Sequence, residues 1–180
     1  MEVTETGLPG VLRVRPRVFE DARGCFFESF NARALATAGI PGSYVQDNQS
    51  KSMRGVLRGL HYQAPRAQGK LVRVLSGEIF DVVVDLRRAS PAFGRWQGTR
   101  LSADNRESLW IPEGCAHGFL VVADSAEVLY KTTDYYAPAD EHCLLWNDPA
   151  LGIHWPLTGA PIVSDKDRAG RPLADAVTFA

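Results

Sequence analysis

The sequence predicts an all-β protein, folded as a sandwich or barrel, with one or a few short helices. Apolar and polar residues alternate along short segments such as 70–75 and 78–87, a spacing typical of half-buried strands. Turn-forming pairs recur between these segments, for example at 90–91 and 104–105. Many short strands with regular turns favour a two-sheet or closed architecture. The 180 residues suffice for one such domain and are few for two.

One helix and the two chain ends depart from the strand pattern. The N-terminal stretch is expected to be an edge strand, or a strand exchanged with a second copy. Asn31 can cap a helix over the alanine-rich residues 32–38, and Gly39 can end it. The polar tail, about residues 161–180, is expected to form an arm over the sheet, so that residues 1–180 are a single domain.

Strand alternation assigns side chains to faces of the predicted sheets. Within residues 78–87, Asp81 falls on a face with apolar neighbours, and within residues 127–133, Tyr130 lies among apolar and hydroxyl side chains. Further β-rich runs occupy residues 70–75, 108–114 and 117–123. A charged side chain that points into a sandwich is costly unless it is paired or used.

Composition excludes several classes of protein. The net charge of −1 gives no reason to expect binding to nucleic acid or to an anionic membrane. The start of the chain lacks a long apolar run, so no signal peptide is expected, and no segment is apolar enough for a membrane span. Cys25, Cys115 and Cys143 are odd in number and far apart. They predict small buried side chains in a cytoplasmic protein, not a disulfide framework or a zinc site.

The segment "PEGCAHGF", residues 112–119, resembles the second conserved motif of the cupin jelly roll, whose histidine points into the barrel. Metal-binding cupins supply further histidines from an earlier motif. Here His61 is followed by Gln63 where a second histidine would stand. His61 and His117 are too few ligands for a typical histidine-rich site. We therefore predict no metal, and a metal-dependent cupin enzyme is the less favoured alternative.

Several polar residues could instead occupy one cavity, although each has an ordinary structural interpretation. His61 alone would be a packed core histidine, Lys70 a surface lysine and Tyr130 a strand tyrosine. Their combination favours a ligand site, and the remaining candidates of this kind are Arg58, Asp81, His117 and Asp167. A second group suits a planar base with phosphates: Arg23, Phe26, Glu28, Gln46, Asp47 and Asn48.

The chain resembles the dTDP-4-dehydrorhamnose 3,5-epimerase family and its dTDP-4-keto-6-deoxysugar epimerase relatives. The resemblance runs from about Pro16 to Asp167 through motifs such as "DARGCFFESFN", "VLRGLHYQ", "LWIPEGCAHGF" and "SDKD". It implies a cupin-like jelly roll, usually a homodimer, that acts on a dTDP-4-keto-6-deoxyhexose without cofactor or metal. Which carbon is inverted stays open, because relatives in antibiotic sugar pathways invert a single centre.

The resemblance also implies roles for individual residues. The 4-keto group acidifies the hydrogens on C3 and C5, so epimerisation needs a base, an acid and stabilisation of an enolate. His61 resembles the base, Asp167 its partner and Tyr130 the acid. Lys70 resembles the cation over the enolate oxygen, with His117 and Asp81 beside it.

The matching nucleotide positions include Arg58, which suits a diphosphate. Phe26 and Tyr135 are candidates to stack on thymine. The remaining matches are Arg23, Glu28, Gln46, Asp47, Asn48, Glu141 and Lys166. A binding protein on the same fold, without catalysis, is a further alternative, but binding alone does not require both an acid and a base.

Overall fold

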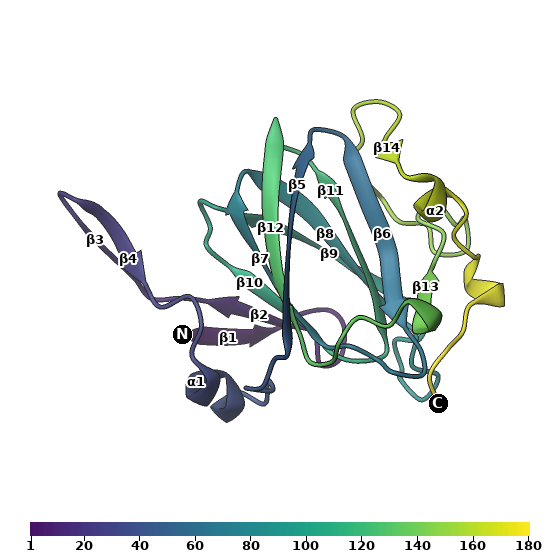
Figure 1. The fold of residues 1–180 in the computed structure, drawn as a ribbon, viewed down its shortest axis with the longest axis horizontal. Helices are drawn as coiled ribbons and strands as arrows, with labels where there is room; N and C mark the ends of the chain where they lie inside the picture. The colour runs from purple at the N-terminus through teal and green to yellow at the C-terminus, as the bar shows by residue number, and fades with distance from the viewer.

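The computed structural model describes all residues, 1–180, and contains two packed β-sheets (Figure 1). The first sheet has the order β1 (Glu2–Glu5), β2 (Leu12–Arg15), β10 (Ser108–Ile111), β7 (Lys70–Ser76), β12 (Ser125–Thr132) and β5 (Gln46–Met53). The second has the order β13 (Glu141–Cys143), β6 (Val56–Gln63), β11 (Cys115–Val121), β8 (Glu78–Asp85) and β9 (Trp96–Ser102). The short strand β14 (Ile162–Val163) pairs in parallel with β6. The predicted all-β class is confirmed, and the sheets form a sandwich that is not closed into a barrel.

The predicted helix is confirmed as α1 (Ala32–Thr37). Asn31 caps it, because its side-chain oxygen accepts a hydrogen bond from the Ala34 N–H at 3.0 Å. Leu35 anchors the helix in a small apolar cluster with Trp110 of β10. A second helix, α2 (Asp165–Arg168), and two 3-10 turns, η1 (Pro138–Asp140) and η2 (Leu173–Asp175), lie in the C-terminal half.

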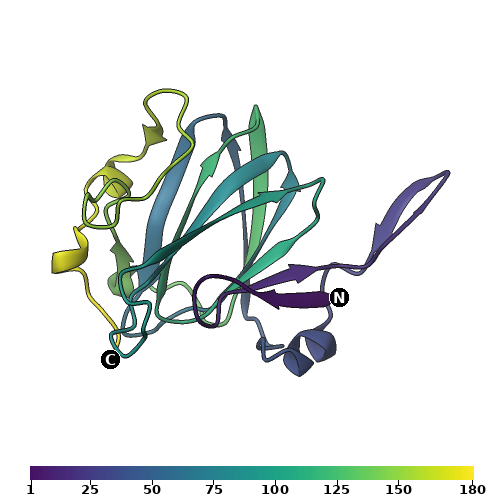
Figure 2. The same ribbon diagram turned by 180° about the vertical axis from the view of Figure 1, so that it is seen from behind.

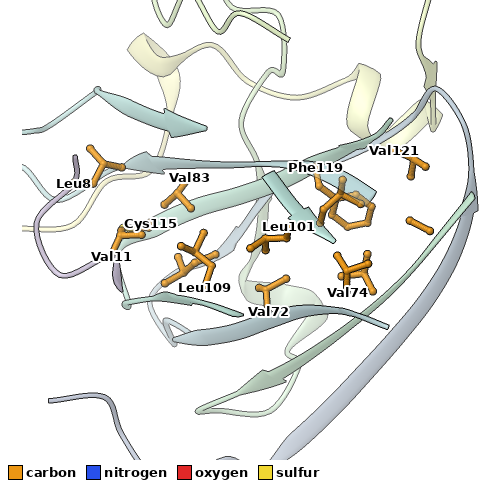
Figure 3. Packing of buried hydrophobic residues seen from close by; sticks show 14 of the residues in the cluster. Leu8, Val11, Val72, Val74, Val83, Leu101, Leu109, Cys115, Phe119 and Val121 are labelled. Carbon is orange, nitrogen blue, oxygen red and sulfur yellow. The ribbon is translucent and has the colours of Figure 1, made fainter. Parts of the chain in front are cut away.

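An apolar core fills one part of the space between the sheets (Figure 3). Val72 and Val74 of β7 enter it from the first sheet, whereas Val83 of β8 and Val121 of β11 enter it from the second. These side chains obey the strand alternation. They are fully or almost fully buried, so they hold the two sheets at a fixed spacing around the rest of the interior.

The outer face of the second sheet is also covered. Val82 and Val84 of β8 point to this face, where they join a second apolar cluster with Leu144 and Leu151 from the segment after β13. The C-terminal chain, yellow in Figures 1 and 2, runs along this side of the molecule past β6. This cover explains why β8 is apolar on both faces. It also brings α2 against β6.

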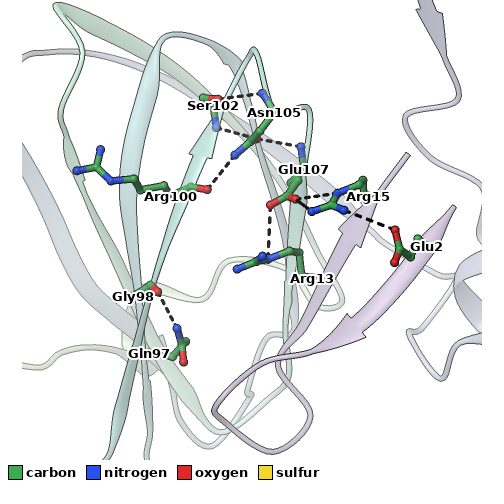
Figure 4. A network of polar contacts seen from close by, with 9 residues as sticks. All are labelled: Glu2, Arg13, Arg15, Gln97, Gly98, Arg100, Ser102, Asn105 and Glu107. Atoms are coloured by element: carbon green, nitrogen blue, oxygen red, sulfur yellow. Dashed lines mark hydrogen bonds and ion pairs between the residues drawn. The ribbon is translucent and has the colours of Figure 1, made fainter. Parts of the chain in front are cut away.

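An ion-pair network fastens the N-terminal strands to the sandwich (Figure 4). Glu107 precedes β10 and is almost buried, and its carboxylate accepts a hydrogen bond from the Arg15 Nη2 at 2.8 Å. Arg13 lies 3.5 Å from the other carboxylate oxygen, and Arg15 lies 3.6 Å from Glu2 of β1. β1 is the edge strand of the first sheet, as the sequence predicts.

The hairpin of β3 (Val18–Asp21) and β4 (Gly24–Phe27) projects away from the sandwich (Figures 1 and 2). Phe26 is 72% exposed, and Cys25 is exposed beside it. The prediction that all three cysteines are buried is therefore wrong for Cys25, because the hairpin projects from the sandwich and leaves this side chain exposed. Cys115 is buried as predicted, and Cys143 is half-buried. None of the helices is long and apolar enough to cross a membrane.

Candidate functional site

A polar cavity of about 520 Å³ continues the space between the two sheets beyond the apolar core. Both sheets contribute to its wall. The first sheet supplies Asp47, Asn48, Gln49, Ser50, Lys70 and Tyr130, and the second supplies Arg58, His61, Tyr62, Gln63, His117, Gly118, Phe119 and Glu141. Gln68 and Tyr136 come from loops. Predicted catalytic and binding residues from both sheets therefore share one cavity.

His61 and Asp167 form a close pair at one side of the cavity. The His61 Nε2 lies 2.6 Å from the Asp167 Oδ1, although the residues are 106 positions apart. Burial raises the pKa of Asp167, but hydrogen bonds from His61 and from the Gly59 N–H outweigh it and hold that pKa below its ordinary value. An ionised carboxylate can only accept, so Nε2 carries the proton. Nδ1 is then the ring nitrogen with a free lone pair.

A bulge in β6 makes this pair possible. His117 of β11 pairs with His61, and Phe119 pairs with Arg58, so β6 has one more residue than β11 over this interval. Strict alternation would place Arg58 and His61 on opposite faces, whereas the bulge turns both into the cavity. Gly59 has φ +111°, and a Cβ there would lie 2.6 Å from the Gly118 Cα. Only glycine fits this position, and its N–H is directed to Asp167 at 3.2 Å.

A second histidine–carboxylate pair lies deeper in the sandwich. The His117 Nε2 is 2.7 Å from the Asp81 Oδ2, and both residues are buried. The Asp81 Oδ1 has no hydrogen-bond partner. Lys70 is also buried, and its Nζ donates to the His61 carbonyl at 3.1 Å. Burial lowers the pKa of Lys70 to about 8, against the attraction of Asp81 and Glu141. Its ammonium group is thus held in a poorly solvated place at neutral pH.

Tyr130 faces the cavity from the opposite sheet. Its strand β12 lies between β7 and β5, and its side chain also packs against the apolar core. Burial raises the pKa of its hydroxyl, and the charge of Arg58 opposes this. The phenol therefore stays protonated near neutral pH and can serve as an acid. Arg58 is held by a hydrogen bond from its Nε to the Ser52 Oγ at 3.0 Å.

The mouth of the cavity carries a tyrosine that the sequence did not predict. Tyr136 lines the cavity and donates from its hydroxyl to Glu141 at 2.7 Å, and Glu141 also pairs with Lys166. Tyr135, the predicted stacking residue, is 63% exposed and does not line the cavity. Both tyrosines lie in the loop after β12. No strand alternation exists there to distinguish them, so the sequence carried no signal for the choice.

Three glutamines that line the cavity were not predicted either: Gln49, Gln63 and Gln68. Gln63 lines the cavity and ties the nearby loop, because its side chain donates to the Arg66 carbonyl at 3.0 Å and accepts from the Ala137 N–H at 2.8 Å. Gln68 donates to the Asp134 carbonyl at 2.8 Å. Gln63 lies two residues after His61 on the same strand. That spacing could have identified it as a cavity residue.

The nucleotide candidates divide into two groups. Asn48 and Asp47 line the cavity, and Gln46 supports them by donating to the Asn48 side chain at 2.8 Å. Arg23 and Phe26 lie on the projecting hairpin, outside this cavity. Glu28, which follows β4, also lies outside this cavity, and its carboxylate accepts a hydrogen bond from the Asn31 side chain. The structure therefore does not bring these three to the cavity of their own chain.

Buried ionisable groups on both walls of a cavity are costly unless they are used. With a proton-accepting nitrogen on one wall and a half-buried phenol on the other, the cavity of this β-sandwich has the groups that an acid–base enzyme needs. The family model described as dTDP-4-dehydrorhamnose 3,5-epimerase matches residues 5–175. The chain belongs to this family, and the family resemblance found in the sequence is confirmed.

Individual relatives agree over nearly the whole chain. The dTDP-4-dehydrorhamnose 3,5-epimerase of Pseudomonas aeruginosa is 59% identical over 180 residues, which cover 99% of each chain. The crystal structure of dTDP-6-deoxy-D-glucose-3,5-epimerase from Legionella pneumophila Philadelphia 1, in complex with dTDP-4-keto-L-rhamnose, has a TM-score of 0.93 and 46% identity. The superposition covers 97% of this chain and 93% of the Legionella chain. A 3'-monoepimerase from Streptomyces bikiniensis, in complex with dTDP-quinovose, has a TM-score of 0.88 and 36% identity, covering 94% and 86%. The predicted cupin-like jelly roll is thereby confirmed.

Proposed function

We propose that this chain inverts C3, C5 or both centres of a dTDP-4-keto-6-deoxyhexose by removing and returning protons, as in the synthesis of dTDP-L-rhamnose or a related deoxysugar. One observation carries the proposal: the His61–Asp167 pair faces Tyr130, from the opposite sheet, across one cavity. Inversion needs a proton to leave one face of a carbon and another to arrive on the opposite face.

In the first half-reaction, Nδ1 of His61 takes the proton from the carbon beside the 4-keto group. Asp167 fixes the tautomer and stabilises the imidazolium as it forms, because its carboxylate is already bonded to Nε2. The electron pair moves into the carbonyl and forms an enolate. Lys70, a buried cation 3.1 Å from the His61 carbonyl, stabilises the enolate oxygen. His117, held by Asp81, serves as a second polar contact.

In the second half-reaction, Tyr130 returns a proton to the opposite face of the same carbon. Its half-buried hydroxyl has a raised pKa, so it carries a proton at neutral pH that it can give to the carbanionic carbon. The route uses only side chains of the protein, so no cofactor enters it. Removal of either the base or the acid is expected to lower kcat about 10²–10⁴-fold.

For the nucleotide, we propose that Arg58 binds the diphosphate as a bidentate donor. Gln46, Asp47 and Asn48 contact the substrate beside it. Tyr136, which lines the cavity, takes the thymine-stacking role that the sequence suggested for Tyr135. Glu141 and Lys166, paired with each other, border the same mouth.

We further propose a homodimer in which the hairpin of one copy reaches the cavity of the other. The hairpin leaves Phe26 72% exposed and projects from its own sandwich. Exposed aromatic rings of this kind are typical of interfaces. The partner hairpin would supply Arg23 and Phe26 to the phosphate and thymine, with Glu28 near its base. Residues 1–180 would then act as one domain in each copy, in the cytoplasm.

The test of the reaction is incubation of the chelator-treated protein with authentic dTDP-4-keto-6-deoxyhexose in deuterated water. Nuclear magnetic resonance then reads deuterium and configuration at C3 and C5 separately. We expect deuterium with inversion at one or both centres, and loss of both signals in His61→Ala. If the pure wild-type protein incorporates no deuterium at either carbon, the proposed function is wrong.

The test of the shared site is subunit complementation. Phe26→Ala and His61→Ala each remove one half of the proposed site. In a mixed dimer, the intact hairpin of the His61→Ala copy meets the intact base of the Phe26→Ala copy. Activity that rises on mixing and refolding the two variants supports the exchanged hairpin. Activity equal to the average of the separate variants contradicts it.

A further inference from the structure

Cys143 is not among the residues that line the cavity, but it lies beside the His61–Asp167 pair. The Sγ is 4.0 Å from the Asp167 Oδ1, and that oxygen is 2.6 Å from the His61 Nε2. All three ligand atoms lie within 4.8 Å of one another. We propose that His61, Cys143 and Asp167 bind a borderline or soft divalent cation, such as Zn²⁺ or Cd²⁺, which switches the enzyme off.

Three separate elements build this site. Cys143 of β13 is the register partner of His61 in β6, so the thiol and the imidazole stand side by side on neighbouring strands. Asp167 comes from α2, where the Ser164 side chain accepts a hydrogen bond from its N–H at 3.1 Å. Asp167 is 3% exposed. The site is therefore set into the fold and is not a chance surface cluster.

The distances suit a tetrahedral ion after small side-chain movements. Bonds of about 2.0 Å to nitrogen or oxygen and about 2.3 Å to sulfur place tetrahedral ligand atoms about 3.2–3.6 Å apart. The contact between His61 and Asp167 must open by about 0.6 Å, and the contact between Cys143 and Asp167 must close by about 0.5 Å. A nitrogen, sulfur and oxygen set selects Zn²⁺ or Cd²⁺ over Mg²⁺, which prefers oxygen ligands.

Occupation of the site would stop proton transfer for a definite reason. The ion binds the Nε2 lone pair, so the ring proton moves to Nδ1, and the Cys143 thiol releases its proton to water. The substrate-facing Nδ1 then carries hydrogen and cannot accept a proton. This consequence, unlike the binding itself, rests on the proposed role of His61. Because the ion binds beside Cys143 and Asp167, which do not line the cavity, it should lower kcat and leave KM nearly unchanged.

The test combines direct binding with kinetics. Cd²⁺ is titrated into the full-length, chelator-treated protein while the thiolate-to-cadmium charge-transfer absorption is recorded, and initial rates are measured at several substrate concentrations. We expect one ion per chain, a fall in kcat of at least tenfold and full recovery on adding chelator. Cys143→Ala and Cys143→Ser should keep their metal-free activity and bind at least tenfold more weakly.

Two controls distinguish this site from cadmium binding elsewhere on the protein or on the substrate. Cys25→Ala removes the exposed thiol of the β3–β4 hairpin, and it should bind Cd²⁺ at His61, Cys143 and Asp167 as tightly as the wild type. Mg²⁺ binds the substrate diphosphate but not a thiolate site, and should not inhibit. Equal cadmium affinity in wild type and both Cys143 variants would overturn the proposal, as would inhibition that high substrate concentration relieves. If the metal-free protein has no epimerase activity, the proposed function is wrong. The absorption titration still shows whether His61, Cys143 and Asp167 bind the ion.

Discussion

The buried charge of Lys70 should make the folded protein less stable, although the same charge stabilises the proposed enolate. Lys70→Met tests both effects. The side chain is 7% exposed, and its Nζ has a single hydrogen-bond acceptor, the His61 carbonyl. Methionine has a similar length and no charge, so it can occupy the same space. The variant should lose activity, because a cation beside a developing enolate is worth about 10²–10³-fold in kcat.

The expected gain in stability follows from the pKa of Lys70. Burial lowers that pKa from 10.5 to about 8, with the attraction of Asp81 already included. This difference means that keeping Lys70 protonated at pH 7 destabilises the folded state by about 3 kcal/mol relative to the unfolded state. Loss of the hydrogen bond to His61 offsets about 1 kcal/mol. Lys70→Met should therefore be more stable than wild type by about 2 kcal/mol at pH 7.

The dependence on pH identifies the cause. Between pH 8 and 10.5 the unfolded lysine keeps its proton while the folded lysine loses it, so the stability of the wild type rises with pH. The advantage of Lys70→Met should be complete below pH 8 and shrink across this interval. Urea denaturation of both proteins at pH 7, 8, 9 and 10 measures it. A variant that is less stable at pH 7, or a difference that does not change with pH, would show that the buried charge of Lys70 does not destabilise the folded protein.

Three further substitutions test other parts of the structure. Gly59→Ala adds a Cβ 2.6 Å from the Gly118 backbone at φ +111°, so the free energy of unfolding should fall by about 2–4 kcal/mol in urea titrations; an unchanged midpoint would contradict the bulge geometry. Asp167→Asn should keep its circular dichroism spectrum and lower kcat by about 10²–10⁴-fold in steady-state assays, whereas a wild-type rate would remove Asp167 from the mechanism. Glu107→Gln weakens the pairs with the N-terminal arginines and should lower Tm by about 2–4 °C in calorimetry without changing kcat; no change in Tm would show that the network does not fasten β1 and β2.

Local patterns predicted those parts of the fold whose causes are local. Asn31 and the alanines after it specify α1 through one capping bond and helix propensity. Alternation placed Asp81 correctly on the inner face of β8. The projecting hairpin was not predicted, because phenylalanine and cysteine, as at Phe26 and Cys25, are residue types that are usually buried. Their exposure depends on where the chain leaves β2.

The site was predictable in composition but not in geometry. The contact between His61 and Asp167 spans 106 positions, so only the family resemblance, and no spacing, connected the two residues. The bulge at Gly59 breaks the alternation that would have separated Arg58 from His61. A bulge adds one residue to one strand, and its position depends on the opposite strand.

Deuterium exchange by Tyr130→Phe separates the two proton transfers and tests the proposed reaction most directly. With His61 intact and the acid removed, the variant should still exchange the substrate hydrogen with deuterated water and form little inverted product. His61→Ala should do neither. Inverted product at the wild-type rate from Tyr130→Phe, or undiminished exchange by His61→Ala, would contradict the assignment of acid and base to opposite walls of the cavity.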